Sequence, residues 1–159
     1  MGTPNIFANY LTSKYKKLHS YKPPEHAGKI DQHMNWFLSS VRPAVQRLIK
    51  VIVGPKAFGH DVYSGEEVEA AKAAFLDQTI TQINKMLEKR QFLIANNEPT
   101  VIDIIFYSEI STALYLLRLK GFQKRFPRVQ AWIKLMSEVE GLLALDEKLV
   151  EMIEKYELE

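Results

Sequence analysis

Pro99-Thr100-Val101-Ile102-Asp103-Ile104 is the segment that says most about how this chain folds. Pro99 suits a loop, Thr100 suits the N-cap of a helix, and Asp103 places a carboxylate three positions after that N-cap. The Thr100 hydroxyl can accept a hydrogen bond from the Asp103 amide while the Asp103 carboxylate accepts one from the Thr100 amide, which satisfies two of the N–H groups that a helix end leaves unpaired. The pattern therefore predicts a helix that begins here, with Ile104 placed to pack on Pro99.

The residues after this box predict a long helix in the middle of a bundle. They leave no polar face, and a helix that is apolar all round is one surrounded by other helices. Gly121 suits the position just after its C-terminal end, so we expect the helix to run to about Lys120. Its apolar members are Val101, Ile104, Ile105, Phe106, Tyr107, Ile110, Ala113, Leu114, Leu116, Leu117 and Leu119.

The rest of the chain also has helical periodicity, and no alternating strand pattern occurs. Ser64 and Glu67 form a second capping box, and Pro43 predicts a kink near 39–42 inside its helix. Residues 54–59 read as a loop. The sequence thus predicts an all-α bundle of about six helices, over 6–18, 30–52, 64–90, 100–120, 127–136 and 142–156.

Composition limits the chemistry. With 159 residues, 47% of them apolar and 25% charged, the chain is one domain or a domain plus a short extension. It has no cysteine, so thiolate nucleophiles, disulfides and cysteine-based metal sites are excluded. No apolar run is long enough to predict a transmembrane segment. Residues 1–60 carry +7 and the remainder −5, which suits an acidic partner, a lipid surface, RNA or simply a solvated basic face.

Four segments together resemble the C-terminal domain of cytosolic glutathione transferases, most closely the theta-like class. They are Ile30-Asp31-Gln32-His33-Met34-Asn35-Trp36, Val51 to Gly59, Gln91-Phe92-Leu93-Ile94 leading into Thr100-x-x-Asp103, and Phe126-Pro127-Arg128-Val129-Gln130-Ala131-Trp132. The resemblance implies a glutathione-transferase C-terminal-like helical domain over residues 23–159. In that family a Thr/Ser-x-x-Asp box opens the buried helix, although here Ile102 stands where alanine usually precedes the aspartate.

Residues 1–22 resemble the last helix of the family's thioredoxin-like half and the linker that leaves it, through Tyr10-Leu11-x-x-Lys14-Tyr15 and Tyr21-Lys22-Pro23. The family has a Glu/Gln-Ser pair at the start of that helix, which holds the γ-glutamyl end of glutathione. By this register Thr3 and Pro4 occupy those positions, and Pro4 has neither a hydroxyl nor an amide N–H to donate. We therefore expect no glutathione site, no cofactor and no catalytic residue in this chain.

The resemblance also implies that the helices at 30–55 and 100–117 line a hydrophobic substrate pocket in an intact enzyme. Met34, Trp36, Phe37 and Phe106 are our candidates for a residual pocket, although core packing without any ligand is the favoured explanation for them. No metal is expected, because His26 and His33 would lie roughly 10 Å apart along one helix. His19 and His60 read as surface or loop residues. Tyr63, Ser64 and Tyr107 have no convergent base in the sequence.

Our leading hypothesis from the sequence is a non-catalytic structural or interaction subunit that docks on other protein subunits within a larger assembly. The candidate partner interface is the apolar stripe of the first helix: Ile6, Phe7, Tyr10, Leu11 and Tyr15.

Two alternatives stay open. The first is the substrate-binding half of a theta-like glutathione transferase, either truncated or completed by another chain. The second is a module that assembles translation complexes, although no aromatic and basic platform predicts nucleic-acid binding. The sequence does not identify the compartment, and we carry an intracellular location, cytoplasmic or mitochondrial, only as an expectation.

Overall fold

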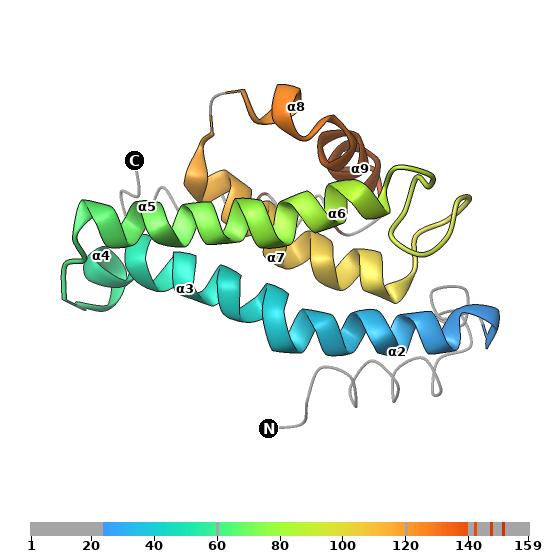
Figure 1. Cartoon of the computed structure of the whole chain (residues 1–159), viewed down its shortest axis with the longest axis horizontal. Helices are drawn as coiled ribbons and strands as arrows, with labels where there is room; N and C mark the ends of the chain where they lie inside the picture. Colours follow the sequence, from blue (N-terminus) through green and yellow to red (C-terminus); the bar gives the residue numbers. More distant parts are fainter. Residues whose placement is uncertain are drawn as a thin grey trace.

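The computed structural model describes residues 24–59, 61–119, 121–139, 142, 147 and 151, and no strand occurs among them. The chain folds into an all-α bundle (Figure 1). In chain order the elements are η2 (Pro24–His26), α2 (Ala27–Trp36), η3 (Phe37–Val41), α3 (Arg42–Ile52), α4 (Gly54–Phe58), α5 (Gly65–Ala74), η4 (Phe75–Ile80), α6 (Thr81–Met86), α7 (Val101–Leu117), α8 (Phe122–Arg125) and α9 (Pro127–Ser137).

The first long rod is α2, η3 and α3 in succession, and the predicted irregularity within it is a π-helical turn at Phe37–Val41. The Arg42 N–H donates to the Phe37 carbonyl, five residues back instead of four. Pro43 follows directly, and it has no N–H to give to the helix while its ring would collide with a carbonyl four residues earlier. The wider turn accommodates the proline without ending the helix.

The second rod is α5, η4 and α6, which lies beside the first in Figure 1. It begins at the Ser64–Glu67 capping box, in which the Glu67 N–H donates to Ser64 Oγ at 3.2 Å and the Ser64 N–H donates to Glu67 Oε2 at 2.9 Å. The sequence does not predict its π-turn η4. There Thr81 donates both its N–H and its hydroxyl to the Leu76 carbonyl, five residues back, and the two bonds favour the wider turn.

Helix α7 lies between the first rod, which contributes α2 and α3, and α9 on the other side. It is not covered all round, which corrects the prediction of a fully surrounded helix. Ser108 and Tyr115 are exposed, and Ile105 and Glu109 are half-buried. The buried stripe of α7 comprises Ile102, Asp103, Phe106, Tyr107, Ile110, Ala113 and Leu117.

The end of α7 also differs from the prediction. The helix stops at Leu117, and Arg118, not Gly121, takes the left-handed conformation that terminates it, with φ of 42°. Gly121 has φ of 79° and stands at the N-terminus of the short helix α8. The segment 54–59, predicted as a loop, contains the one-turn helix α4, which Gly59 closes at φ of 65°.

In the described part of the chain, the main core is one apolar cluster to which every long helix contributes. Its largest fully buried side chains are Trp132, Tyr107, Phe37, Phe75 and Phe106. The predicted helices at 6–18 and 142–156, and the predicted domain boundary between residues 22 and 23, lie wholly or mainly outside the described residues, so they stay predictions.

Candidate functional site

The Asp103 carboxylate is the polar centre of the buried interior. Its Oδ2 accepts from the Thr100 N–H at 2.9 Å and from the Thr100 hydroxyl at 2.8 Å. Its Oδ1 accepts from the Leu93 N–H at 2.7 Å and from the Trp132 indole N–H at 3.0 Å. Four donors thus converge on one carboxylate from the N-cap residue of α7, from the loop before it and from α9.

Burial raises the pKa of Asp103, and the bonds from Leu93, Thr100 and Trp132 oppose that rise. Because both oxygens are already occupied by protein donors and the side chain is fully buried, no acceptor faces a ligand. The Trp132 bond was missed in the sequence analysis, since the two residues are 29 positions apart. We assign Asp103 and Thr100 to the positioning of α7, and not to chemistry.

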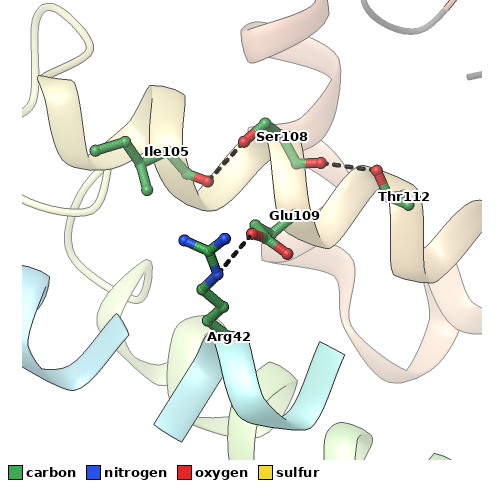
Figure 2. A network of polar contacts seen from close by, with 5 residues as sticks. All are labelled: Arg42, Ile105, Ser108, Glu109 and Thr112. Atoms are coloured by element: carbon green, nitrogen blue, oxygen red, sulfur yellow. Dashed lines mark hydrogen bonds and ion pairs between the residues drawn. The ribbon is translucent and has the colours of Figure 1, made fainter. Parts of the chain in front are cut away.

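A second polar group lies at the surface where α3 packs against α7. Arg42 Nε lies 3.7 Å from Glu109 Oε1, and the side chains are 38% and 23% exposed (Figure 2). Burial raises the pKa of Glu109, and the charge of Arg42 opposes that rise. We call Arg42, Ile105, Ser108, Glu109 and Thr112 the α3–α7 seam.

The two hydroxyls of the α3–α7 seam bond along α7. Ser108 Oγ donates to the Ile105 carbonyl at 2.9 Å, and Thr112 Oγ1 donates to the Ser108 carbonyl at 2.8 Å (Figure 2). Since each hydroxyl proton is used in this way, the oxygens still have lone pairs for an external donor. The α3–α7 seam therefore combines an apolar side chain, an ion pair and two acceptor oxygens, which suits binding and orientation of a ligand more than nucleophilic attack.

Sequence reasoning missed the α3–α7 seam, but a signal for it exists. Glu109 is the one charged residue between Asp103 and Arg118 in a run that is otherwise apolar or uncharged. A single carboxylate in such a helix needs a cation or solvent, and only the fold shows that Arg42 supplies the cation.

The four candidate pocket residues lie together at the packing of α2 and η3 against α7. Met34, Phe37 and Phe106 are fully buried, and the Phe106 ring lies 5.2 Å from that of Phe37 and 5.4 Å from that of Trp36. Trp36 is half-buried and lines a shallow hollow with Gln32, His33, Gln82 and Met86.

The other predicted sites are placed as follows. The Ser64–Glu67 capping box is exposed at the start of α5. The candidate partner interface, Ile6, Phe7, Tyr10, Leu11 and Tyr15, lies outside the described residues, so docking on partner subunits stays a prediction. His33 Nδ1 lies 2.6 Å from the Lys29 carbonyl of its own helix.

The described ranges contain no group of three or more His, Asp or Glu side chains arranged to hold a metal ion. None of the helices in this part of the chain is long and apolar enough to cross a membrane.

Comparison with solved structures identifies the class of fold, which is that of the C-terminal helical domain of glutathione transferases. Human glutathione-S-transferase T1-1 in its apo form matches 98% of this chain with a TM-score of 0.79 and 21% identity. Ure2p5 from Phanerochaete chrysosporium, cocrystallized with 1-(S-glutathionyl)-2,4-dinitrobenzene, matches 96% with a TM-score of 0.79 and 21% identity. An epsilon-class glutathione S-transferase from the housefly Musca domestica matches 98% with a TM-score of 0.72 and 17% identity.

The chain spans 64% of the length of the human protein and 70% of each of the other two. No protein-family model and no curated protein sequence matches it. The resemblance inferred from the sequence is thus confirmed at the level of the fold.

The prediction that the chain is not an enzyme is contradicted. The solved structures that match nearly the whole chain are those of glutathione transferases, which are enzymes. We based that prediction on the lack of a thioredoxin-like half in these 159 residues, and that lack does not exclude an enzyme.

Proposed function

We propose that this chain is the helical, substrate-binding part of a glutathione transferase. The observation that carries the proposal is the match of 98% of the chain to human glutathione-S-transferase T1-1. The proposal requires a thioredoxin-like half that holds glutathione, on the same polypeptide or on another chain. The helices then supply the walls that receive the second substrate.

The α3–α7 seam is our candidate for that wall. It joins the two helical segments, 30–55 and 100–117, that the family resemblance associates with the substrate pocket. Ile105 offers apolar surface, while the Arg42–Glu109 pair and the two hydroxyls offer polar groups at its edge. A few placed polar groups on an apolar wall are typical of sites that bind and orient small molecules.

The chemistry of a matched structure indicates what this wall would receive. Ure2p5 was cocrystallized with an aromatic glutathione conjugate. In forming such a conjugate from a chlorinated nitroaromatic compound, the glutathione thiolate makes the C–S bond and chloride leaves with the C–Cl electron pair. We propose that the α3–α7 seam holds the aromatic electrophile, with the Arg42 guanidinium beside its nitro oxygens.

The test joins this chain to the thioredoxin-like half of human glutathione-S-transferase T1-1. Conjugation of glutathione to 1-chloro-2,4-dinitrobenzene is then followed by absorbance of the thioether. We expect turnover well above that of the thioredoxin-like half alone. We expect Arg42→Gln to raise KM for the electrophile by roughly three- to tenfold, the loss of about one weak charge-assisted contact.

Arg128→Gln is the matched control. Arg128 is also a partly exposed arginine in a loose ion pair, 3.8 Å from Glu88, but it lies on α9 away from the α3–α7 seam. Its KM should equal that of the unmodified fusion. A folded fusion that binds glutathione by calorimetry, yet turns over no faster than the thioredoxin-like half alone, would refute the proposed function. Equal changes in KM for the electrophile in Arg42→Gln and Arg128→Gln would refute the proposal that the α3–α7 seam binds the electrophile.

A further inference from the structure

The segment 118–137 concentrates positive charge. It contains six Lys or Arg residues and no Asp or Glu, and it forms the turn after α7, the short helix α8 and the helix α9. These elements lie at an outer edge of the bundle, because α9 packs on α6 and α7 while the first rod lies on the other side of α7 (Figure 1). A surface whose charges have one sign favours partners of the opposite sign.

Helix α9 turns one side to the core and the other side to solvent. Val129, Trp132 and Met136 are buried. Because of the helical repeat, the exposed positions gather on the opposite side. We call these exposed residues the outer face of α9: Pro127, Arg128, Ala131, Lys134 and Leu135.

An apolar stripe runs along the outer face of α9, with a cation on each side of it. Pro127, Ala131 and Leu135 are four positions apart, so they form the stripe. Leu135 is one of three large hydrophobic side chains that are exposed in the described part of the chain. At about 100° of rotation per residue, Arg128 lies on one side of the stripe and Lys134 on the other. An apolar stripe with charged flanks is the arrangement by which paired helices select each other.

The arginines of α8 and α9 already contact carboxylates. Arg125 lies 2.6 Å from Asp77 on the second rod, and Arg128 lies 3.8 Å from Glu88 just after it. The two arginine side chains are still 56% and 46% exposed. A further carboxylate from outside the chain can therefore reach them.

Two lysines extend this surface. Lys124 on α8 and Lys134 on α9 are exposed, and neither forms an ion pair with another of the described residues. Glu138 follows Lys134 by about one helical turn and is also exposed. Negative charge on a partner is therefore favoured toward α8 and disfavoured beyond Lys134.

The outer face of α9 suits a protein helix better than a nucleic acid or an anionic membrane. It has no aromatic ring on which a base could stack. Its stripe has one large apolar side chain, Leu135, whereas helices that lie in a membrane surface bury several Trp, Phe or Leu residues. A short apolar stripe between cations instead matches a helix that has carboxylates on both sides of its own apolar stripe.

We propose that the outer face of α9 docks an amphipathic helix of another protein, with Leu or Ile along its apolar side and Glu or Asp on both flanks. Ala131 and Leu135 contact the apolar side of that helix. Its carboxylates pair with Lys124, Arg128 and Lys134. The docking uses neither glutathione nor a thioredoxin-like half, so it stands independently of the proposed function.

Fluorescence anisotropy of a labelled synthetic peptide tests this proposal on the 159-residue chain. The peptide has about three heptads, with Leu at positions a and d and Glu at positions e and g, and a second peptide has Lys in place of each Glu. We expect the Glu peptide to bind with an affinity that falls as salt rises, and the Lys peptide not to bind. Absence of Glu-peptide binding at millimolar protein, or equal binding of the two peptides, would overturn the proposal.

Charge reversal at position 134 has a matched control. Lys134→Glu should reduce the affinity for the Glu peptide by roughly five- to twentyfold, because one attraction becomes a repulsion. Lys29→Glu makes the same change in net charge at an exposed position on α2, and it should reduce the affinity by less than about twofold. Equal losses in the two variants would mean that only total charge matters, which contradicts docking on α9.

Leu135→Ser tests the apolar stripe in the same assay. It should weaken Glu-peptide binding by roughly three- to tenfold. Val62→Ser removes a hydrophobic side chain that is 87% exposed outside the outer face of α9, and it should leave the affinity unchanged. Equal affinities of the two variants would contradict the role of the stripe.

Two other anionic partners are measured alongside the peptides. They are vesicles of phosphatidylserine and phosphatidylcholine, and a single-stranded oligouridylate. Binding of either one that is lost in Lys134→Glu, without binding of the Glu peptide, would assign the outer face of α9 to a membrane or a nucleic acid and would refute the docking of a helix.

Discussion

The indole N–H of Trp132 donates to Asp103 Oδ1 at 3.0 Å, and this bond ties α9 to the first turn of α7. The same oxygen accepts from the Leu93 amide. One buried carboxylate therefore holds the loop before α7, the start of α7 and the middle of α9 in a single arrangement. Because α7 carries one side of the α3–α7 seam, the position of that seam depends on this contact.

Asp103→Asn should lower the free energy of unfolding by about 2–4 kcal/mol. The asparagine amide has one acceptor oxygen, so its NH₂ group must face two of the four donors that now bond the carboxylate, and buried donors are left unpaired. Urea denaturation followed by circular dichroism measures the change. Glu67→Gln is the control, since it alters the same kind of capping box at an exposed position, and it should cost under about 1 kcal/mol. Equal losses of unfolding free energy in the two variants would show that burial of the hydrogen bonds to Asp103 adds nothing to stability.

The stability difference between the natural chain and Glu109→Gln should depend on pH. Burial raises the pKa of the Glu109 carboxyl in the folded state above its ordinary value of 4.5. At a pH between the unfolded-state and folded-state pKa values, the folded chain therefore holds the Glu109 proton more firmly than the unfolded chain does. The stabilisation by Glu109 is therefore fully present below 4.5 and is lost as pH rises through the folded pKa. Urea titrations should show that, between about pH 4 and about pH 7, the free energy of unfolding of the natural chain falls relative to that of Glu109→Gln. A shift in the opposite direction would mean that Arg42, and not burial, dominates.

Arg118→Gly and Gly121→Ala should change stability in opposite directions. Glycine relieves the left-handed strain at position 118 and should stabilise by about 0.5–1 kcal/mol. Alanine at position 121 introduces such strain and should destabilise by about 1 kcal/mol. An added Cβ at Gly121 would meet no atom within 4 Å, so the cost there is conformational and not steric. Thermal denaturation of both variants checks this, and shifts of the same sign would contradict it.

Phe106→Ala should be among the most damaging substitutions of α7, at about 3–5 kcal/mol, because the ring is fully buried against Trp36 and Phe37 and its removal leaves a cavity. Tyr115→Ala removes a ring of similar size that is 37% exposed on the same helix, and it should cost much less. If Phe106 instead borders a ligand pocket, its truncation would be tolerated and the two variants would have similar denaturation midpoints.

Local sequence patterns predicted the interior of the fold well. Ser64, Glu67, Thr100 and Asp103 indicate helix starts because capping is a matter of residues three apart, and Pro43 indicates the irregular turn before it because a proline acts on its own helix. The end of α7 was predicted less well. Gly121 and Arg118 are both left-handed, and the sequence favours the glycine for the terminal position because arginine rarely adopts that conformation.

The candidate site could be predicted only in part. Helices at 30–55 and 100–117 follow from the resemblance, but the contacts that make the site do not, because Arg42 and Glu109 are 67 positions apart and Asp103 and Trp132 are 29 apart. The hollow between the end of α7, the turn into α8 and the helix α9 depends on where the chain reverses after Leu117, which local sequence patterns did not predict.

The amino-acid sequence alone was enough to predict that this chain is helical and where most of its long helices begin, since those properties follow from periodicity and capping within each segment. The class of fold was implied by the resemblance of four segments to a known family. The packing of the helices, by contrast, sets which side of α7 is left uncovered, brings Arg42 to Glu109 there, and places Arg118 and Lys124 along one hollow. The physical reason is that side chains distant in sequence meet only when whole helices pack, and the angle and offset of that packing are properties of the assembled core.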